Sequence, residues 1–448
     1  MSGPRHAIKG GYFLMKYFRF DSGFDELPYL LYADQSGRII EHPYLRMAGL
    51  SGKMPVIPDD LLPMPEYSKL FFLPDCPPLG IDPENGELEV VTQMEDGDGK
   101  TGPCFAVAAF PEPGFVRTLL PAAIYDRKNY TLPMWANTAV GYRDGKYWIA
   151  AFRVEDNPKW DPRNYDDKLL LPSIKSFTKI HRGPLTRHLV QCATVNHCFA
   201  AKNLFLRRWE APIPVSRKCN ASCLGCLSLQ PHDSCEASHS RIGFRPSADE
   251  IVSIAVEHLE RAPEAMVSFG QGCEGEPLTE DGLIAESIRK IRLRTAMGSI
   301  NLNTNGGYTD RLRTVIKSGL DSVRISLNSA RPELYCAYYR PRGYGFSNVV
   351  DSIKAAVDAG IFTMINYLVF PGITDQPEEV EALKGLIVRT GIDFVHLKNL
   401  CIDPELYLRS MAVAEEKGIG MAALADLLKN EFPRLEIGYF NKRLSGRA

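Results

Sequence analysis

The sequence lacks the features that would place it in a specialised class of protein. Its 448 residues include 52 Lys and Arg against 54 Asp and Glu, so neither charge is in excess. A near-neutral chain has no general attraction for nucleic acid or for an anionic membrane surface. Hydrophobic residues make up 45% and charged residues 24%, which is ordinary for a globular protein with a packed core. We therefore expect a globular chain with no membrane partner and no nucleic-acid partner.

Long hydrophobic runs are also missing. The most apolar long stretch, 353–370, is interrupted by Lys354 and Asp358, whereas a membrane helix needs about 20 predominantly apolar residues. The first twenty residues carry basic side chains such as Arg5 and Lys9 without an apolar core. This pattern predicts no signal peptide and a cytoplasmic location.

A disulfide framework is not expected either. The chain has 11 cysteines, an odd number, and a large chain without a secretion signal usually keeps its thiols free. No compact cysteine cluster follows residue 401, and no cobalamin-binding motif is visible. Most of the cysteines are scattered, but three of them, Cys219, Cys223 and Cys226, lie within eight residues.

The composition predicts two domains that meet near residue 205. The first part consists of short strand-like runs separated by Gly and Pro, such as 29–32 and 39–40 on either side of the turn-like 34–37. We expect residues 1–205 to form a mainly β accessory or substrate-docking domain.

Residues 206–448 alternate between short apolar runs and longer amphipathic segments. The predicted strands are 212–216, 265–269, 299–304, 322–327, 363–370 and 394–398. The predicted helices are 248–261, 281–296, 310–318, 347–359, 377–390 and 421–430. Six β-then-α units favour an α/β fold with a parallel sheet and helical crossovers. Periodicity alone leaves both an open sheet and a barrel as alternatives.

The three close cysteines form a C-x3-C-x2-C loop directly after the first predicted strand. Three thiolates on one short loop suit a cubane iron–sulfur cluster whose fourth iron is left for another ligand. A zinc site normally needs four protein ligands. The alternatives are buried cysteines or a zinc site completed by a nearby donor. Those nearby donors are Cys235, His232 and His239.

With this loop and its position, the chain from Trp209 to Tyr439 resembles the radical S-adenosylmethionine (radical SAM) superfamily. The resemblance implies a partial (β/α)6 TIM-like barrel over 206–448. It also implies a 4Fe-4S cluster on Cys219, Cys223 and Cys226, with the amine and carboxylate of SAM on the fourth iron. One departure is Gly225, because the residue before the last cysteine is usually aromatic in the family.

The resemblance extends to a set of SAM-binding residues at the ends of the next strands. Gly275-Glu276-Pro277 is similar to the Gly-Gly-Glu-type motif of the family, although Cys273 stands where many members have glycine. The polar residues assigned to SAM at the ends of the third and fourth strands are Asn303, Asn305, Arg324, Ser326 and Asn328. Alternation also places Asn301 on the face of Asn303 and Asn305. The asparagines could instead be ordinary polar residues at a strand end. Arg324 could instead be a structural residue that pairs with a helix carboxylate.

The function that the resemblance implies is reductive cleavage of SAM to a 5′-deoxyadenosyl radical, which abstracts hydrogen from a substrate. The substrate is a peptide or protein or a small metabolite, and the electron comes from a donor such as flavodoxin or ferredoxin. The alternative is a non-catalytic iron–sulfur or zinc scaffold with a partner-binding N-terminal domain.

Further candidates lie near the same strand ends. Cys401 follows the sixth predicted strand and is the candidate catalytic residue, ahead of Cys336, which has Tyr335, Tyr338 and Tyr339 around it. An ordinary packed cysteine is the alternative for both. His396 alternates with apolar neighbours and is expected to be a packed core residue. A last candidate is an auxiliary metal site on Cys192, His197 and Cys198.

Overall fold

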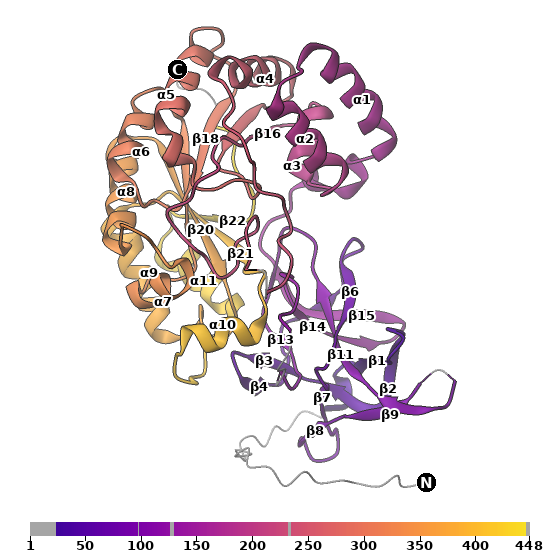
Figure 1. The fold of residues 1–448 in the computed structure, drawn as a ribbon. Coiled ribbons are helices and arrows are strands. Elements are labelled where there is room, and N and C mark those ends of the chain that lie inside the picture. Colours follow the sequence, from indigo (N-terminus) through magenta and orange to yellow (C-terminus); the bar gives the residue numbers. More distant parts are fainter. Residues whose placement is uncertain (1–23, 97, 126–129, 232–233, 445–448) are drawn as a thin grey trace.

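The computed structural model describes residues 24–444 apart from 97, 126–129 and 232–233. The first twenty residues, for which the sequence predicts no signal peptide, lie outside the described residues. The candidate zinc ligand His232 does so too. The described chain forms a β-rich N-terminal region, three helices and a parallel β/α barrel (Figure 1).

The described part of the N-terminal region contains fifteen short strands. They are β1 (Tyr29–Ala33), β2 (Ile39–Met47), β3 (Gly49–Ser51), β4 (Met54–Val56), β5 (Leu61–Pro63), β6 (Lys69–Leu73), β7 (Leu79–Ile81), β8 (Leu88–Val90), β9 (Gln93–Glu95), β10 (Thr101–Pro103), β11 (Phe105–Phe110), β12 (Phe115–Arg117), β13 (Leu120–Pro121), β14 (Thr138–Arg143) and β15 (Lys146–Arg153). Ten of them form one antiparallel sheet with the central order β12-β15-β14-β11-β1-β2-β7-β8. The predicted strand–turn–strand is confirmed, because β1 pairs with β2 and the Asp34 carboxylate accepts hydrogen bonds from the turn.

Three helices follow that the sequence patterns did not predict: α1 (Asp167–Ile180), α2 (Pro184–Thr194) and α3 (Phe199–Phe205). Their buried side chains, such as Leu170 and Leu189, belong to the same hydrophobic core as the barrel strands. The N-terminal region is therefore mainly β up to β15, and the helical segment packs with the barrel. The division of the chain at residue 205 stays a prediction.

The barrel is a sheet of seven parallel strands in chain order. They are β16 (Glu210–Ile213), β17 (Met266–Phe269), β18 (Ser299–Thr304), β19 (Ser322–Leu327), β20 (Phe362–Val369), β21 (Phe394–Asn399) and β22 (Glu436–Gly438). The predicted α/β fold with a partial barrel is confirmed. The short strand β22 is an addition to the six predicted strands.

The helices between these strands are α4 (Ala248–Arg261), α5 (Asp281–Arg292), α6 (Thr309–Ile316), α7 (Pro332–Tyr339), α8 (Phe346–Asp358), α9 (Pro377–Thr390), α10 (Pro404–Met411) and α11 (Met421–Glu431). The predicted bounds of α4 and α9 are confirmed. Ser247 caps α4 by accepting from the backbone N–H of Glu250, which is the bond expected of an N-cap serine. The helices α7 and α10 were not predicted.

The N-terminal region docks on the carboxyl end of the barrel, beside β20 and β21 (Figure 1). The fully buried Arg117 of β12 donates through Nη2 to the carbonyl of Leu400 at 2.8 Å, and its backbone N–H donates to the Asn399 side chain at 3.0 Å. In return, the Asn399 amide donates to the carbonyl of Phe115. A second contact joins the backbone N–H of Gly52 to the carbonyl of Pro371 at 2.9 Å. Polar contacts therefore fix the sheet against this edge of the barrel.

Within the described residues, no helix is both long enough and apolar enough to span a bilayer.

Candidate functional site

The candidate site lies where the parallel strands end. Because all seven strands run in the same direction, the loops that follow them meet at one rim of the barrel. The cysteine loop follows β16, the Gly275 loop follows β17, Asn305 follows β18 and Cys401 follows β21. The fold therefore brings the predicted loops to the same end of the molecule.

The three cysteines share one partly buried environment. Burial raises the pKa of Cys219 and raises that of Cys223 further, and the neighbouring thiols raise both in addition. Arg241 donates through Nη2 to the sulfur of Cys226 at 3.2 Å. Without a cation among them, three close thiols would resist ionisation, so this donor set fits a positively charged metal centre.

The other proposed zinc donors are directed elsewhere. Cys235 interacts with Asp403 and with the backbone of Met134, whereas His239 interacts with Cys192 and His188. These contacts do not support a zinc site that either residue completes with the three cysteines.

Helix α7 holds the cysteine loop by its backbone. The carbonyls of Tyr339 and Tyr338, at the last turn of the helix, accept from the N–H groups of Ser222 and Leu224, both at 3.0 Å. Arg342 continues the clamp, because its guanidinium donates to the carbonyl of Cys219 at 3.0 Å. The carbonyls at the end of α7, which have no partner within the helix, thus accept hydrogen bonds from the cysteine loop.

The unusual Gly225 has a steric cause. A Cβ atom at this position would lie 2.8 Å from the hydroxyl of Tyr338, and the next atoms would be 3.6 Å away. The buried Tyr338 ring of α7 therefore occupies space beside the loop that a side chain at position 225 would need. The same ring interacts with Cys223, Cys226 and Cys401.

The Gly275-Glu276-Pro277 loop lies directly against the start of the cysteine loop. The N–H of Gly275 donates to the carbonyl of Ser216, and the N–H of Glu276 donates to that of Lys218, both at 2.8 Å. A Cβ atom on residue 275 would overlap the carbonyl of Lys218. Glycine is therefore required at this close approach.

The carboxylate of Glu276 is buried and engaged by the protein itself. It accepts from the N–H of Leu278 at 3.1 Å, the hydroxyl of Thr304 at 2.5 Å and the N–H of Asn305 at 2.9 Å. Burial raises its pKa to about 7, and these donors act against the rise. Glu276 therefore joins the Gly275 loop to the end of β18.

Glu274, two residues earlier, was not predicted as a site residue. Its side chain accepts from four backbone N–H groups, those of Val215, Ser216, Gly270 and Gln271, at 2.8–2.9 Å. Burial raises its pKa to about 7. This carboxylate ties the loop after β17 to the end of β16, and only the three-dimensional arrangement reveals it.

The asparagines in and directly after β18 make amide hydrogen bonds within the protein. Asn301 donates to Asn303 at 3.0 Å, and Asn303 donates to the carbonyl of Gly270 at 2.9 Å. Asn305 donates to the side chain of Asn220, inside the cysteine loop, at 2.7 Å. The predicted shared face is consistent with the first of these bonds, but the amides of Asn303 and Asn305 bind the protein's own loops.

The three polar residues of the fourth strand are not grouped as predicted. Arg324 donates to Asn441 at 3.0 Å, and Ser326 accepts from Asn366 of β20 at 3.4 Å. Asn328 lies beyond the end of β19, is fully buried, and donates to the carbonyl of Leu334 and the hydroxyl of Tyr407. The alternation ends with the strand, so Asn328 is directed toward α7 and α10 and not toward the partners of Arg324 and Ser326.

Arg324 and Ser326, two residues apart on β19, are half-buried, and the neighbouring strands β20 and β21 carry half-buried residues beside them. They include Asn366 and Leu368 of β20 and Lys398 of β21. Side chains two residues apart on a strand share a face, so these residues line an interior face that packing does not close completely. Burial and, after it, the charge of Arg324 lower the pKa of Lys398 to about 7. Lys398 and Asn366 were not predicted as site residues, because each lies in an ordinary strand pattern.

Cys401 lies at the predicted rim and contacts the domain interface. Its sulfur is 3.5 Å from the carbonyl of Asn399, and it interacts with Arg117 and Tyr338. Cys336 is exposed on α7, whereas its neighbours Tyr335, Tyr338 and Tyr339 are buried. His396 is fully buried, as predicted for a core residue.

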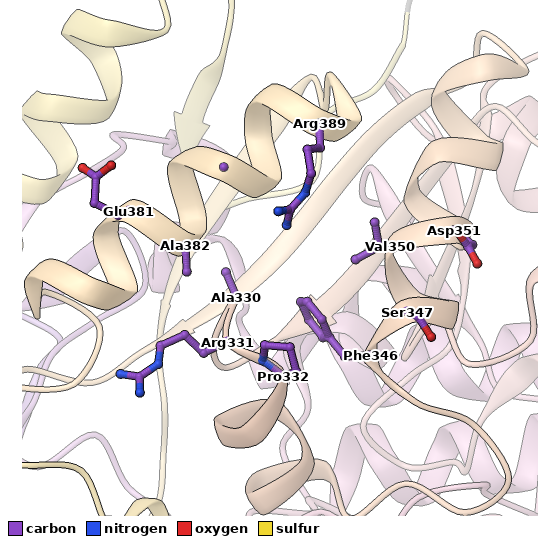
Figure 2. A pocket seen from close by; sticks show the side chains of 11 residues that line it. Ala330, Arg331, Pro332, Phe346, Ser347, Val350, Asp351, Glu381, Ala382 and Arg389 are labelled. Carbon is purple, nitrogen blue, oxygen red and sulfur yellow. The ribbon is translucent and has the colours of Figure 1, made fainter.

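A surface pocket of about 430 Å³ lies elsewhere, between α8 and α9 on the outside of the barrel (Figure 2). Phe346 and Val350 line one side of it, and Ala382 and Arg389 line the other. The cysteine loop contributes no residue to this pocket, so we do not assign it to the chemistry of the rim.

Among solved structures, the fold is similar to two at a TM-score of 0.37 each. Streptococcus suis SuiB bound to precursor peptide SuiA is 14% identical, with 56% of this chain and 52% of that chain covered. Native anSMEcpe with bound AdoMet is 18% identical, with 51% and 63% covered. Similarity at this level carries no argument about function.

Curated relatives share part of the sequence. GTP 3′,8-cyclase of Petrotoga mobilis is 30% identical over 199 residues, which is 44% of this chain and 53% of the relative. GTP 3′,8-cyclase of Heliobacterium modesticaldum is 28% identical over 171 residues, covering 36% and 47%. The chain thus spans about half the length of these relatives. The family model of the radical SAM superfamily matches residues 213–383, which contain the cysteine loop, the Gly275 loop and strands β17 to β20. With this rim, residues 213–383 match the radical SAM superfamily, whose cofactors are a 4Fe-4S cluster and SAM.

Proposed function

We propose that this protein is a radical SAM enzyme that holds a 4Fe-4S cluster on Cys219, Cys223 and Cys226. When bound, the cluster and SAM supply reductive cleavage of SAM to a 5′-deoxyadenosyl radical, which abstracts hydrogen from a substrate. The observation that carries the proposal is the clamping of the cysteine loop between α7 and the Gly275 loop at the carboxyl rim. Such a clamp preorganises three thiolates around one centre.

The chain's own residues divide the remaining work. We propose that the backbone of Gly275, Glu276 and Pro277 borders the SAM site, with Ser326 and Arg324 on the interior face of β19. Glu276, Asn303, Asn305 and Asn328 act as positioning residues, because their side chains bind the protein's own loops and helices. Cys401 remains the candidate for a direct role beside the substrate.

The partners follow from this chemistry. A one-electron donor such as flavodoxin or ferredoxin reduces the cluster, and the substrate is a peptide or protein or a small metabolite. Nucleic acid is not proposed as a partner, because the charge of the chain is balanced. We place the protein in the cytoplasm, since all eleven cysteines are free and thiols persist in a reducing compartment.

Anaerobic reconstitution tests the proposal. The protein is incubated with iron, sulfide, dithionite and SAM, and 5′-deoxyadenosine and methionine are measured by chromatography. We expect both products from the wild type and from Cys235→Ala, a matched change at a nearby half-buried cysteine. Cys223→Ala should give only background. GTP, the substrate named for the curated relatives, belongs in the first panel of candidate substrates.

The scaffold alternative makes a different prediction. If the wild type carries a cluster, confirmed by its absorption and electron paramagnetic resonance, but forms no more 5′-deoxyadenosine than Cys223→Ala, the protein is a non-catalytic iron–sulfur scaffold. A mononuclear metal on the three cysteines would instead support a zinc scaffold.

A further inference from the structure

A second group of metal-binding side chains lies outside the cysteine loop. The donor atoms of His188, Cys192 and Cys273 all lie within 4.8 Å of one another, and all three residues are buried. The sulfur of Cys192 is 3.6 Å from Nε2 of His188. The sequence placed Cys192 with His197 and Cys198. His197 is exposed and does not join this group, whereas Cys198 interacts with Cys192 and Cys273.

Two separate segments build this group. His188 and Cys192 lie four residues apart on α2, which places them on one face of the helix. Cys273 belongs to the loop after β17 that continues into Gly275 and Glu276. A residue of a third segment is near, because His239 interacts with both Cys192 and His188.

From this geometry we infer that His188, Cys192 and Cys273 bind a mononuclear divalent transition metal, with zinc as the expected ion. Two thiolates with one imidazole are a donor set that zinc favours in a tetrahedral site. A water or His239 would complete the fourth position.

The site would act as a cross-link between parts of the fold. It would join the helices α1–α3 to the loop that holds Gly275 and Glu276. The carbonyl of Cys273 already accepts from the N–H of Ile242 at 2.8 Å, so the segment that carries His239 is attached at the same place. The inference does not depend on the proposed reaction, because none of the three donors belongs to the cysteine loop.

Element-specific measurements test it on the full chain. The protein is supplied with zinc alone and freed of excess, and zinc is then counted by mass spectrometry. We expect about one zinc per chain, with sulfur scatterers near ~2.3 Å and nitrogen near ~2.0–2.1 Å in zinc-edge X-ray absorption. The stoichiometry should fall to background in Cys192→Ser and in Cys273→Ser.

Two further variants keep the test decisive. Cys104→Ser changes an equally buried cysteine in the N-terminal region and should keep the zinc. A variant with alanine at Cys219, Cys223 and Cys226 should also keep it, which separates this site from the cluster. The inference is overturned if Cys192→Ser and Cys273→Ser, still folded by circular dichroism, bind as much zinc as the wild type. It is equally overturned if zinc is lost with the three loop cysteines, or if Cys192 and Cys273 form a disulfide and the reduced protein takes up no zinc.

Discussion

At the scale of single residues, Gly225 and Tyr338 form a pair whose contact can be tested directly. Gly225→Ala would place a Cβ atom 2.8 Å from the Tyr338 hydroxyl, and overpacking of this kind costs about 1–3 kcal/mol. We expect a lower melting temperature and less bound iron per chain. Adding Tyr338→Phe removes the clashing atom and should restore both quantities, because the remaining neighbours are 3.6 Å away. If the double variant is no better than Gly225→Ala, the hydroxyl is not the obstacle.

Lys398 gives a pH dependence of stability. Burial, followed by Arg324, lowers its pKa to about 7 from 10.5, while Glu210 and Glu155 oppose the change. The unfolded chain then binds more protons between these two values, so the free energy of unfolding gains a contribution that rises with pH across that window. The limit is about 1.4 kcal/mol per pH unit.

Urea unfolding at several pH values from about 7 to 9 measures this contribution. Lys398→Met should remove the rise, whereas Lys354→Met, at an exposed helical position, should keep it. An unchanged pH dependence in Lys398→Met would show that Lys398 does not titrate in this range in the folded protein.

At the scale of elements, the amide of Asn305 connects the end of β18 to the cysteine loop. Asn305→Ala removes the donor to Asn220 and the acceptor for the N–H of Gly307. Leaving buried partners unsatisfied costs about 1–3 kcal/mol, so we expect lower stability and slower cluster assembly. Asn305→Asp keeps the acceptor and removes the donor. Its stability and its rate of cluster assembly should therefore lie between those of the wild type and Asn305→Ala. Equal assembly rates in all three proteins would exclude this connection as a support of the loop.

The elements also show what sequence patterns can predict. Helices α4 and α9 were predicted with their observed bounds, because Ser247 caps one and Pro377 begins the other. Helix α7 was missed because its less buried residues Cys336 and Ala337 are also apolar, so the sequence shows no contrast between a polar and an apolar face. Helix α1 was missed because Pro172 lies inside it.

The candidate site likewise has features that the sequence predicted and features that only the structure revealed. The cysteine loop is local in sequence, so its spacing alone predicted it. The roles of Glu274 and Lys398, and the grouping of His188 with Cys273, depend on contacts between distant segments. A side chain such as Asn328, on which the pattern placed a SAM contact, instead supports α7 because the strand ends one residue before it.

At the scale of the whole molecule, Arg117 attaches the N-terminal sheet to the barrel. Its guanidinium donates to the carbonyls of Leu400 and Asn137, so Arg117→Met would leave both carbonyls buried without this donor. We expect a loss of stability of about 2–4 kcal/mol and faster hydrogen exchange in β12 and in 399–403. Arg153→Met, at an exposed arginine of the same sheet, should leave both unchanged. Unaltered exchange at the interface in Arg117→Met would mean that other contacts fix the sheet.

The contact between Gly52 and Gly372 also limits which sequence changes the N-terminal region and the barrel can accept where they meet. Both glycines have positive φ values, 61° and 80°, and a Cβ atom on Gly372 would overlap the backbone at Ser51 and Gly52. Position 372 cannot gain a side chain unless the main chains separate, whereas at position 52 a Cβ atom would lie 3.4 Å from the carbonyl oxygen of Gly372 and only the positive φ disfavours it. A chimera that grafts this N-terminal sheet onto another barrel would therefore need glycine at the recipient's equivalent of position 372, so the two parts must be inherited or engineered as a matched pair.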